Sequence, residues 1–199
     1  LMAENIFPIY DRLVQFEDRC RRLNQRPVSL WFCGLSGSGK STIAIGLEKI
    51  LFQKGYIVQV LDGDNIRNGI NSNLGFSVED RLENNRRVAE ISKLYNRSGL
   101  ITINSFISPT KDIRAHAKAI IGEEFFKEIY IKASLDVCEK RDVKGLYKKA
   151  RRGEIKGFTG IDSPFEVPEV PFLEIDTEKH TLDECIQSLF KAIEPLIRI

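Results

Sequence analysis

The chain has 199 residues, enough for one domain with a full hydrophobic core. Hydrophobic residues make up 42% and charged residues 29%, as in ordinary globular proteins. The net charge of +2 argues against a protein that binds nucleic acid in bulk, because such proteins are usually more basic. Leu1–Asn5 lack a signal-peptide pattern, and no apolar run has the length of a membrane helix, so we expect a cytoplasmic protein.

The first part of the chain has apolar residues at helical spacing. Ile9, Leu13, Phe16 and Leu23 predict an amphipathic helix over Pro8–Asn24, which the following Gln-Arg-Pro sequence ends. We treat this part as an N-terminal helical extension over residues 1–27.

Strands and helices alternate through the rest of the chain. Short apolar or β-branched segments predict five strands, at Val28–Cys33, Tyr56–Leu61, Leu100–Phe106, Glu128–Ala133 and Phe172–Asp176. Helices are expected at Lys40–Lys54, Glu79–Arg97, Asp112–Ile121 and Leu182–Ile193. In the second of these, Val88, Ile91 and Leu94 are expected on one side. The alternation predicts a single α/β domain over residues 28–199, a five-stranded, mostly parallel sheet flanked by helices, with ligands at the carboxyl ends of its strands.

The four cysteines are scattered and form no C-x-x-C pair: Cys20, Cys33, Cys138 and Cys185. This spacing does not favour a zinc site. Cys33 and Cys138 stand among apolar residues and are expected in the core, which we prefer to a redox role. Such usage suits a reducing compartment.

A phosphate-binding motif follows the first expected strand. GLSGSGKS at residues 34–41 matches G-x-x-x-x-G-K-[ST] and opens a helix. Glycines let backbone N–H groups approach phosphate, and the helix start adds the positive end of its dipole. A glycine-rich turn without a ligand is the alternative, which the flanking strand and helix disfavour. We expect a nucleoside triphosphate to contact Gly34, Gly37, Ser38, Gly39, Lys40, Ser41 and Thr42, with Lys40 on the β- and γ-phosphates, Ser41 on Mg²⁺ and Thr42 on the α-phosphate.

Two carboxylates follow the second strand. Asp62 and Asp64 flank Gly63, close to where a γ-phosphate would lie. We assign Asp62 to accepting a proton from an attacking hydroxyl or positioning the metal water, and Asp64 to the loop or the acceptor. Alone, a turn with solvated carboxylates would be the better reading. A phosphate loop upstream and Arg67 beside the pair reverse that preference.

An acceptor site is expected around the next helix. Arg67 and Arg81 have the guanidinium groups that match phosphate or sulfate oxygens, and Phe76 offers a ring for base stacking. After the third strand, Pro109 stiffens a turn that we expect to leave Ser108 exposed at the carboxyl edge of the sheet. Phe106, just before this turn, is expected in the core.

A basic stretch at residues 141–156 holds seven basic residues against two acidic ones. Glycines at 145, 153, 157 and 160 would let it move. We interpret residues 141–166 as a lid that closes cations over the transferring phosphate and excludes water. A solvated basic helix or a nucleic-acid patch is the alternative.

Six stretches together resemble the adenylylsulfate kinase family: GLSGSGKST (34–42), LDGDNIR (61–67), N-x-N-L-G-F (71–76), SFISP (105–109), RDVKGLYKKAR (141–151) and GEIKGFTGIDSPFE (153–166). They span roughly residues 28–176. The phosphate loop alone is common to many nucleotide-binding proteins, whereas the other stretches in combination are specific to this family.

The resemblance implies a P-loop kinase fold and a defined reaction. Such enzymes transfer the γ-phosphate of MgATP to the 3′-hydroxyl of adenosine 5′-phosphosulfate, which gives 3′-phosphoadenosine 5′-phosphosulfate and ADP in sulfate activation. It further implies a homodimer and functional pairing with a separate sulfurylase. The net charge and the lack of a membrane-length apolar run predict no nucleic-acid or membrane partner. Some bacterial members carry a phosphorylated serine at the position of Ser108.

The resemblance also implies roles for individual residues. Catalytic roles fall on Asp62, Lys40 and Ser108, and the Mg²⁺ site on Ser41 and Asp62. Beyond the phosphate loop, ATP would contact Arg141, Thr177 and His180. The acceptor would contact Asp64, Asn65, Arg67, Phe76, Arg81, Asn84, Ile107, Ser108, Lys144, Gly157 and Phe158, with its adenine between the rings of Phe76 and Phe158.

Three other functions stay open at this point. Another P-loop kinase for a nucleoside or small molecule would use the same phosphate loop. A non-catalytic nucleotide-binding module would not need Lys40, Ser41 and Asp62 together. Nucleic-acid binding through residues 141–156 would produce an affinity that falls steeply with salt.

Overall fold

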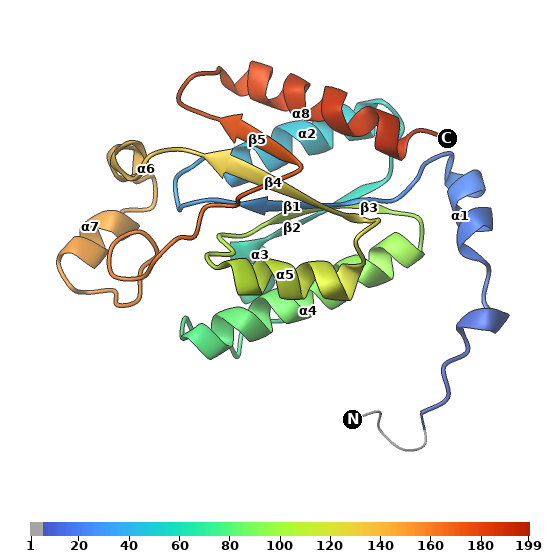
Figure 1. Cartoon of the computed structure of the whole chain (residues 1–199), viewed down its shortest axis with the longest axis horizontal. Helices are drawn as coiled ribbons and strands as arrows, with labels where there is room; N and C mark the ends of the chain where they lie inside the picture. Colours follow the sequence, from blue (N-terminus) through green and yellow to red (C-terminus); the bar gives the residue numbers. More distant parts are fainter. Residues whose placement is uncertain (1–5) are drawn as a thin grey trace.

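The computed structural model describes residues 6–199 (Figure 1). The expectation about a signal pattern in Leu1–Asn5 therefore lies outside the described residues. Five strands form one sheet in the order β2-β3-β1-β4-β5, and every neighbouring pair is parallel. The five-stranded sheet predicted from the sequence is confirmed. Its strands are β1 (Ser29–Cys33), β2 (Val58–Asp62), β3 (Ile101–Ser105), β4 (Phe126–Lys132) and β5 (Leu173–Asp176).

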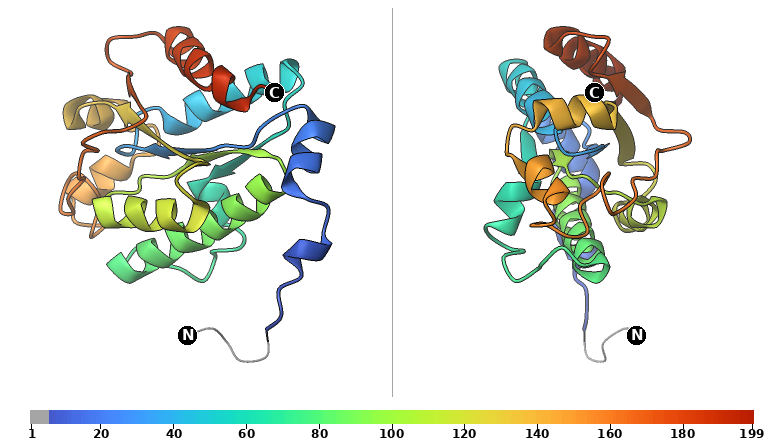
Figure 2. Two further views of the ribbon diagram at one scale, coloured as in Figure 1. Left: turned by 45° about the vertical axis from the view of Figure 1, so that its right-hand side comes forward. Right: turned by 90° about the vertical axis from the view of Figure 1, so that its left-hand side faces the viewer.

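Helices cover both faces of this sheet (Figures 1 and 2). Helices α2 (Lys40–Gln53) and α8 (Leu182–Ile197) lie on one face, and α4 (Val78–Arg97) and α5 (Lys111–Ile121) on the other. None of the helices in residues 6–199 is both long and apolar enough to cross a membrane. The short elements are η1 (Tyr10–Arg12), α1 (Phe16–Leu23), α3 (Gly63–Arg67), α6 (Leu135–Arg141) and α7 (Leu146–Arg151).

The central strand β1 feeds both layers of the core. Its five residues are all buried, and alternate side chains point to opposite faces, as the pleat of a strand requires. Leu30 and Phe32 pack among residues of α2 and α8, whereas Trp31 packs with Phe106 and Phe126 on the α4–α5 face. The expectation that Phe106 lies in the core is confirmed.

A buried polar network ties β1, β3 and α4 together. Ser29 Oγ donates to Asn96 Oδ1 at 2.6 Å and lies 2.8 Å from Thr102 Oγ1. Ser92 Oγ donates to Asn104 Oδ1 at 2.7 Å, and Asn104 Nδ2 donates to Thr102 Oγ1 at 3.2 Å. Buried polar groups are tolerated only when they are paired, so this network fixes how α4 sits on the sheet.

The N-terminal segment is less helical than the sequence predicted. Instead of one helix over Pro8–Asn24, a single 3-10 turn at Tyr10–Arg12 leads through extended backbone at Leu13 to a helix that begins at Phe16. Ile9 and Leu13 are exposed. Short helices need a packed face for stability, and this part of the extension has no buried residue to supply one.

One prediction about helix α4 is also wrong. Leu94 was expected beside Val88 and Ile91, but it is 58% exposed. Two turns of 3.6 residues beyond Val88 fall at Tyr95, not at Leu94, and Tyr95 packs on the α4–α5 core. The adjacent inward positions hold Ser92 and Asn96 of the polar network, which an apolar pattern does not reveal.

We predict that Asn96→Ala lowers the free energy of unfolding by about 2 kcal/mol, because it removes one of the two partners of the buried Ser29 hydroxyl and the side-chain donor to the carbonyl oxygen of Leu100. Asn68→Ala, at an exposed asparagine, serves as the control and should change it by less than about 0.5 kcal/mol. Urea unfolding measures both values. Equal, small effects for the two variants would show that the network does not stabilise the contact between α4 and the sheet.

Candidate active site

The carboxyl ends of the five parallel strands meet at one edge of the sheet, and the segment carrying α6 and α7 lies beyond this edge (Figure 1). Parallel α/β sheets bind ligands at this edge, where loops from neighbouring strands converge. The residues that directly follow the strands are Gly34, Gly63, Phe106, Ala133 and Thr177.

The phosphate loop needs glycine at two of its positions. Gly34 has a φ of 149°, and a Cβ there would lie 2.4 Å from the carbonyl oxygen of Ile131. Gly37 has a φ of 78°, and its Cβ would lie 3.0 Å from the carbonyl oxygen of Cys138. A side chain at either position would therefore be strained by its backbone and crowded by its neighbour. The loop takes the shape that brings its backbone close to a ligand.

A buried ammonium group lies beneath the loop. Lys40 Nζ donates to the carbonyl oxygens of Gly34 at 2.9 Å and Leu35 at 2.7 Å. Burial is the largest cause that lowers the pKa of Lys40 to about 8. Ser38 Oγ is also buried and has no hydrogen-bond partner among the described residues. The Lys40 ammonium and the Ser38 hydroxyl can both still donate hydrogen bonds, which suits them to phosphate oxygens.

The two oxygens expected to serve a metal lie together. Ser41 Oγ donates to Asp62 Oδ2 at 2.7 Å, and Asp62 Oδ1 accepts from Asp64 N at 3.1 Å, which caps helix α3. In residues 6–199, no group of three His, Cys, Asp or Glu side chains is placed to hold a metal ion by itself. Mg²⁺ commonly uses one or two carboxylates and takes its other ligands from water and substrate phosphates. A hydroxyl and one carboxylate beside a phosphate loop therefore fit Mg²⁺.

Arg141 and Thr177 close the other side of the loop. Arg141 Nη1 lies 3.3 Å from the carbonyl oxygen of Gly37 and 3.1 Å from Thr177 Oγ1, and it donates to both. Thr177 Oγ1 in turn donates to the carbonyl oxygen of Ser38 at 3.0 Å. His180, also expected near ATP, is exposed in the loop before α8. The structure thus joins Arg141 and Thr177 directly to the phosphate loop.

The predicted acceptor residues gather across from the loop. The guanidinium of Arg67 lies over the ring of Phe76 at 4.4 Å, and its Nη1 donates to the carbonyl oxygen of Gly75 at 2.7 Å. Arg81 Nε donates to the carbonyl oxygen of Phe76 at 2.9 Å, and Arg81 Nη1 donates to Thr159 Oγ1 at 2.8 Å. Arg67, Phe76 and Arg81 therefore form one cluster, and Arg81 connects it to the lid.

The lid is attached by ion pairs. Lys144 pairs with Asp64 of helix α3. Arg151 pairs with Glu139, and Arg152 with Glu154. Two of the three acidic partners belong to the lid or to the helix before it, so three of the seven basic residues of this run have a local countercharge. This arrangement argues against a continuous basic surface for nucleic acid.

Two asparagines of the predicted acceptor set differ in their surroundings. Asn65 is exposed on helix α3, where a ligand can reach it. Asn84 is buried, and its Oδ1 accepts from Asn71 Nδ2 at 3.0 Å. Asn84 therefore already supports the 71–76 loop that carries Phe76. The structure places Asn84 behind the acceptor cluster.

Ser108 is buried, and the expectation that Pro109 leaves it exposed is wrong. It is only 1% exposed and has a φ of 46°, a left-handed conformation that is uncommon for a residue other than glycine. Its Oγ accepts from Trp31 Nε1 at 3.0 Å and donates to Asn85 Oδ1 at 2.8 Å. The turn points the hydroxyl into the protein, while the carbonyl of Ile107 accepts from Gly34 N at 3.3 Å.

The lid has a small core of its own. Tyr147 and Phe158 pack edge to face with ring centroids 5.0 Å apart, and Cys138 is buried in the same cluster. Cys33 is buried too, so the expectation that both cysteines are core residues is confirmed. Phe76 is 67% exposed, whereas Phe158 is 8% exposed. The adenine sandwich of Phe76 and Phe158 stays a prediction, which requires the lid to move.

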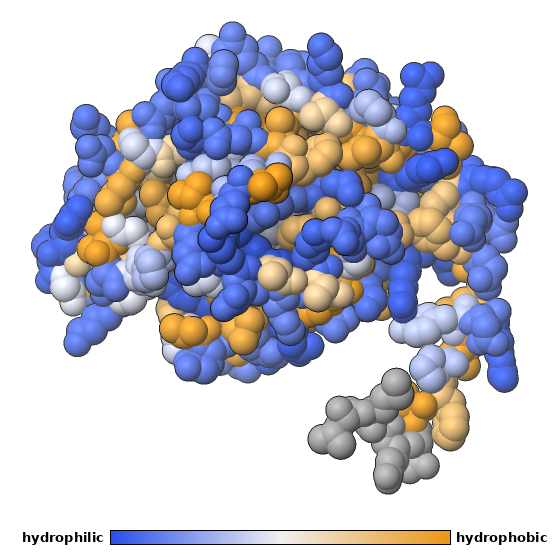
Figure 3. Space-filling model, in the orientation of Figure 1, coloured by the Kyte–Doolittle hydropathy of each residue, from blue (hydrophilic) through white to orange (hydrophobic). Residues whose placement is uncertain are grey.

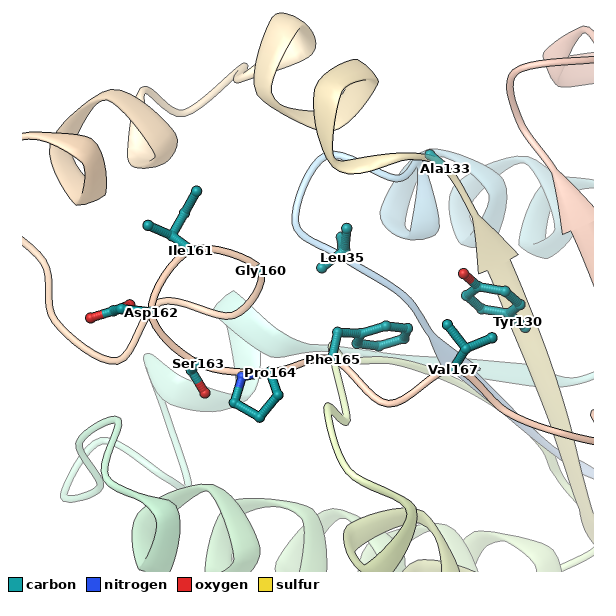
Figure 4. A pocket seen from close by; sticks show the side chains of 10 residues that line it. All are labelled: Leu35, Tyr130, Ala133, Gly160, Ile161, Asp162, Ser163, Pro164, Phe165 and Val167. Carbon is teal, nitrogen blue, oxygen red and sulfur yellow. The ribbon is translucent and has the colours of Figure 1, made fainter.

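A hollow of about 610 Å³ lies where residues 160–167 meet the segments that follow β1 and β4 (Figure 4). Its walls come from lid residues 160–167 on one side and from Leu35, Tyr130 and Ala133 on the other. Phe165 stacks on Tyr130 with centroids 6.0 Å apart. The segment is also held by Glu166, whose backbone N–H donates to the carbonyl oxygen of Pro109 at 2.8 Å and whose carboxylate accepts from Lys111 N at 2.6 Å.

Several residues of the site escaped sequence reasoning. Tyr147 Oη donates to the carbonyl oxygen of Ser36, and Thr159 accepts from Arg81. The Asp162 carboxylate accepts from the backbone N–H groups of Gly157 and Phe158 in a tight turn. These hydrogen bonds, first that of Gly157, lower the pKa of Asp162. The glycines around Thr159 were the available signal for this turn, but nothing in them shows which side chain it serves.

We predict that Lys40→Met weakens ATP binding by about 10- to 100-fold, because a charge-assisted hydrogen bond contributes about 1.5–3 kcal/mol. The same change should leave the free energy of unfolding equal or higher, since it removes a desolvated cation. Lys49→Met, at an exposed lysine of the same helix, is the control for both measurements. Calorimetric titration and urea unfolding give the two quantities, and a normal affinity for ATP would contradict the assignment of Lys40.

The chain matches known proteins over most of its length. The family model described as adenylylsulphate kinase matches residues 26–176. An adenylyl-sulfate kinase of Phocaeicola vulgatus is 58% identical over 194 residues, which cover 98% of this chain and 95% of that protein. An adenylyl-sulfate kinase of Clostridium acetobutylicum is 51% identical and covers 91% and 90%.

Solved structures agree with this match. The Mycobacterium tuberculosis APS kinase in complex with AMPPNP and APS is 43% identical, with a TM-score of 0.82, and covers 85% of this chain and 98% of that chain. The hexameric APS kinase of Thiobacillus denitrificans is 31% identical, with a TM-score of 0.65, and covers 86% and 29%. The motifs at the carboxyl edge of the sheet and the similarity along the chain lead to one conclusion: this protein belongs to the adenylylsulfate kinase family.

Proposed function

We propose that this protein is an ATP-dependent adenylylsulfate kinase in which Asp62, at the end of β2, acts on the attacking hydroxyl. It transfers the γ-phosphate of MgATP to the 3′-hydroxyl of adenosine 5′-phosphosulfate, and the products are 3′-phosphoadenosine 5′-phosphosulfate and ADP. Family membership supports this reaction. The single observation that carries the residue assignment is the 2.7 Å contact between Ser41 Oγ and Asp62 Oδ2 beside the phosphate loop.

Asp62 is suited to the role of base or orienting group. One of its oxygens caps helix α3 and the other meets Ser41, so its position is fixed from two sides. A general base must lie within hydrogen-bond reach of the proton that it accepts. In our proposal the 3′-hydroxyl approaches this carboxylate. Ser41 and Asp62 would hold Mg²⁺, which would neutralise charge on the phosphate oxygens.

Positioning and charge account for most of the proposed catalysis. The phosphoryl group that is transferred carries its charge mainly on oxygens, so little covalent chemistry is asked of the protein. Lys40 faces these oxygens from below. Arg141 reaches the phosphate loop from the lid side, at the carbonyl of Gly37. Both cations are in place before the acceptor binds.

The acceptor fits the cluster of Arg67, Phe76 and Arg81. Its phosphosulfate is a doubly anionic group, and two guanidinium groups beside one ring provide matched charge and a stacking face. Arg81 also donates to the carbonyl oxygen of Gly157, and Lys144 pairs with Asp64. We therefore propose that lid closure and acceptor binding use the same residues. Ser108 takes part through its backbone and position, since its hydroxyl is buried.

The reaction is tested by ADP release from MgATP with adenosine 5′-phosphosulfate and, as the control acceptor, adenosine 5′-monophosphate. Turnover with the phosphosulfate and little with the monophosphate is expected, because only the first brings the sulfate to the arginine cluster. Turnover with neither acceptor, together with measurable ATP binding, would contradict the proposed function and favour a non-catalytic module or a kinase for another substrate.

We predict that Asp62→Asn lowers kcat by about 10²- to 10⁴-fold, the usual contribution of a general base. Asparagine is as good a helix cap as aspartate, so α3 should stay folded and the Kd for adenosine 5′-phosphosulfate should change little. Asp112→Asn, at an exposed aspartate in the first turn of α5, is the matched control. Full turnover by the Asp62 variant would show that another group orients the hydroxyl.

We further propose a homodimer in which the N-terminal extension contacts a second copy. The extension projects from the body of the protein (Figures 1 and 3). Six large apolar side chains in residues 6–14 are exposed: Ile6, Phe7, Ile9, Tyr10, Leu13 and Val14. Monomeric proteins rarely expose so much contiguous apolar surface, so a protein partner is the natural cover for it.

Light scattering during gel filtration tests the dimer. Phe7→Ser combined with Val14→Ser should convert a dimer to a monomer, while the exposed pair Val143→Ser and Val170→Ser should leave the mass unchanged. The Phe7→Ser/Val14→Ser variant should stay folded as a monomer, because neither replaced side chain is buried in its own chain. A dimer that persists in the extension variant would contradict this proposal.

Two further expectations remain proposals. We propose a cytoplasmic location, which the four free and buried cysteines support. We also propose that a separate sulfurylase supplies the acceptor, since a mixed anhydride of phosphate and sulfate must be made by a reaction that joins sulfate to an adenylyl group.

A further inference from the structure

The turn after β3 is held in a conformation that its sequence does not favour. Ser108 and Asn24 are the two residues other than glycine with positive φ in the described part of the chain. A left-handed conformation costs such a residue about 1–2 kcal/mol, so surrounding contacts must hold Ser108 in place. Trp31 of β1 and Asn85 of α4 hold its hydroxyl.

Arg114 of helix α5 holds the backbone of the same residue. It is 4% exposed, and its Nη1 donates to the carbonyl oxygen of Ser108 at 2.9 Å. Its Nε lies 2.5 Å from Glu128 Oε1 on β4. The guanidinium therefore contacts Glu128 through Nε as an ion pair that lacks hydrogen-bond geometry, and it donates a hydrogen bond to Ser108 through Nη1. A lysine has one charged nitrogen and could not reach both partners from the same position. Side chains from three elements, β1, α4 and α5, meet at this turn, and β4 supports the third through Glu128.

The turn is also tied to the phosphate loop. The carbonyl of Ile107 accepts from the backbone N–H of Gly34 at 3.3 Å. Successive carbonyls of the turn, those of Ile107 and Ser108, are therefore fixed by the phosphate loop and by Arg114. Asn85 extends the link further, because its Nδ2 donates to the carbonyl oxygen of Arg81 at 2.8 Å.

We propose that Arg114 is a positioning residue for the phosphate acceptor, which it serves by fixing the Ile107–Ser108 turn between the phosphate loop and the arginine cluster. The proposal rests on the proposed function, in which this turn lines the acceptor site. Arg114 is buried, so it would act through Ser108 and not by contact with a nucleotide. Its partner Glu128 orients the guanidinium from the neighbouring strand.

A purely structural ion pair would have different consequences. Replacing a buried ion pair by neutral groups of similar size is often neutral for stability, whereas removing one partner leaves an uncompensated charge. Stability and acceptor positioning can therefore be separated by comparing Arg114→Met with the double variant Arg114→Met/Glu128→Gln. Lys118 of the same helix forms an exposed ion pair with Glu123, and Lys118→Met/Glu123→Gln is therefore the matched control.

In the double variant, the melting temperature should lie closer to that of the unmodified protein than in Arg114→Met. The KM for adenosine 5′-phosphosulfate should nevertheless stay raised about tenfold or more in both variants, while the KM for ATP changes less than about twofold, since misplacing a positioned substrate by about 1 Å is costly. Glu128→Gln alone keeps the donor to Ser108 and should raise the acceptor KM less than about threefold. If Arg114→Met does not fold, the double variant decides the comparison.

Amide hydrogen exchange over residues 105–110 gives a reading that does not depend on activity. Exchange should be faster in the double variant than in the unmodified protein and unchanged in the control variant. A double variant with a normal acceptor KM, or with normal exchange in this segment, would overturn the proposal. Absence of turnover in the unmodified protein would instead count against the proposed function, and the exchange measurement would still decide whether Arg114 fixes the turn.

Discussion

The active site depends on a buried ammonium group, that of Lys40, which is held by backbone carbonyls of the phosphate loop. Burial lowers its pKa to about 8, so the protein carries the cost of a desolvated cation at neutral pH. Phosphate oxygens would supply the missing countercharge. The positive φ angles of Gly34 and Gly37 and the unpartnered hydroxyl of Ser38 serve the same purpose, because they leave the loop able to bind an anion.

The parallel sheet brings the other groups to this cation. Asp62, the turn at Ile107 and Ser108, and Thr177 all follow strands that end at the same edge. Each is also joined to the phosphate loop or to its helix: Asp62 through Ser41, the turn through Gly34, and Thr177 through Ser38. A change in the conformation of one of these loops is therefore expected to shift the phosphate loop. The lid enters the same system through Arg81 and Lys144.

The sequence predicted what depends on local pattern. The phosphate loop, the carboxylate at Asp62 and the alternating strands and helices are encoded by short motifs and periodicity, and the sheet and its family were confirmed. The inward turn of Ser108 was missed because its left-handed backbone is stabilised by Trp31, Asn85 and Arg114, which are distant in sequence. The extended backbone at Leu13 was missed for the opposite reason: Ile9 and Leu13 continue the apolar pattern but are exposed and bury no surface in their own chain.

Proton uptake on nucleotide binding tests the role of Lys40 most directly. At pH 9, above its lowered pKa, Lys40 in the free protein is mostly neutral, and bound phosphates should raise its pKa and restore the proton. Calorimetric titration with ATP in buffers of different ionisation enthalpy should therefore show uptake of a substantial fraction of one proton at pH 9 and much less at pH 7. Equal proton uptake at the two pH values would contradict the claim that a desolvated ammonium awaits the phosphates.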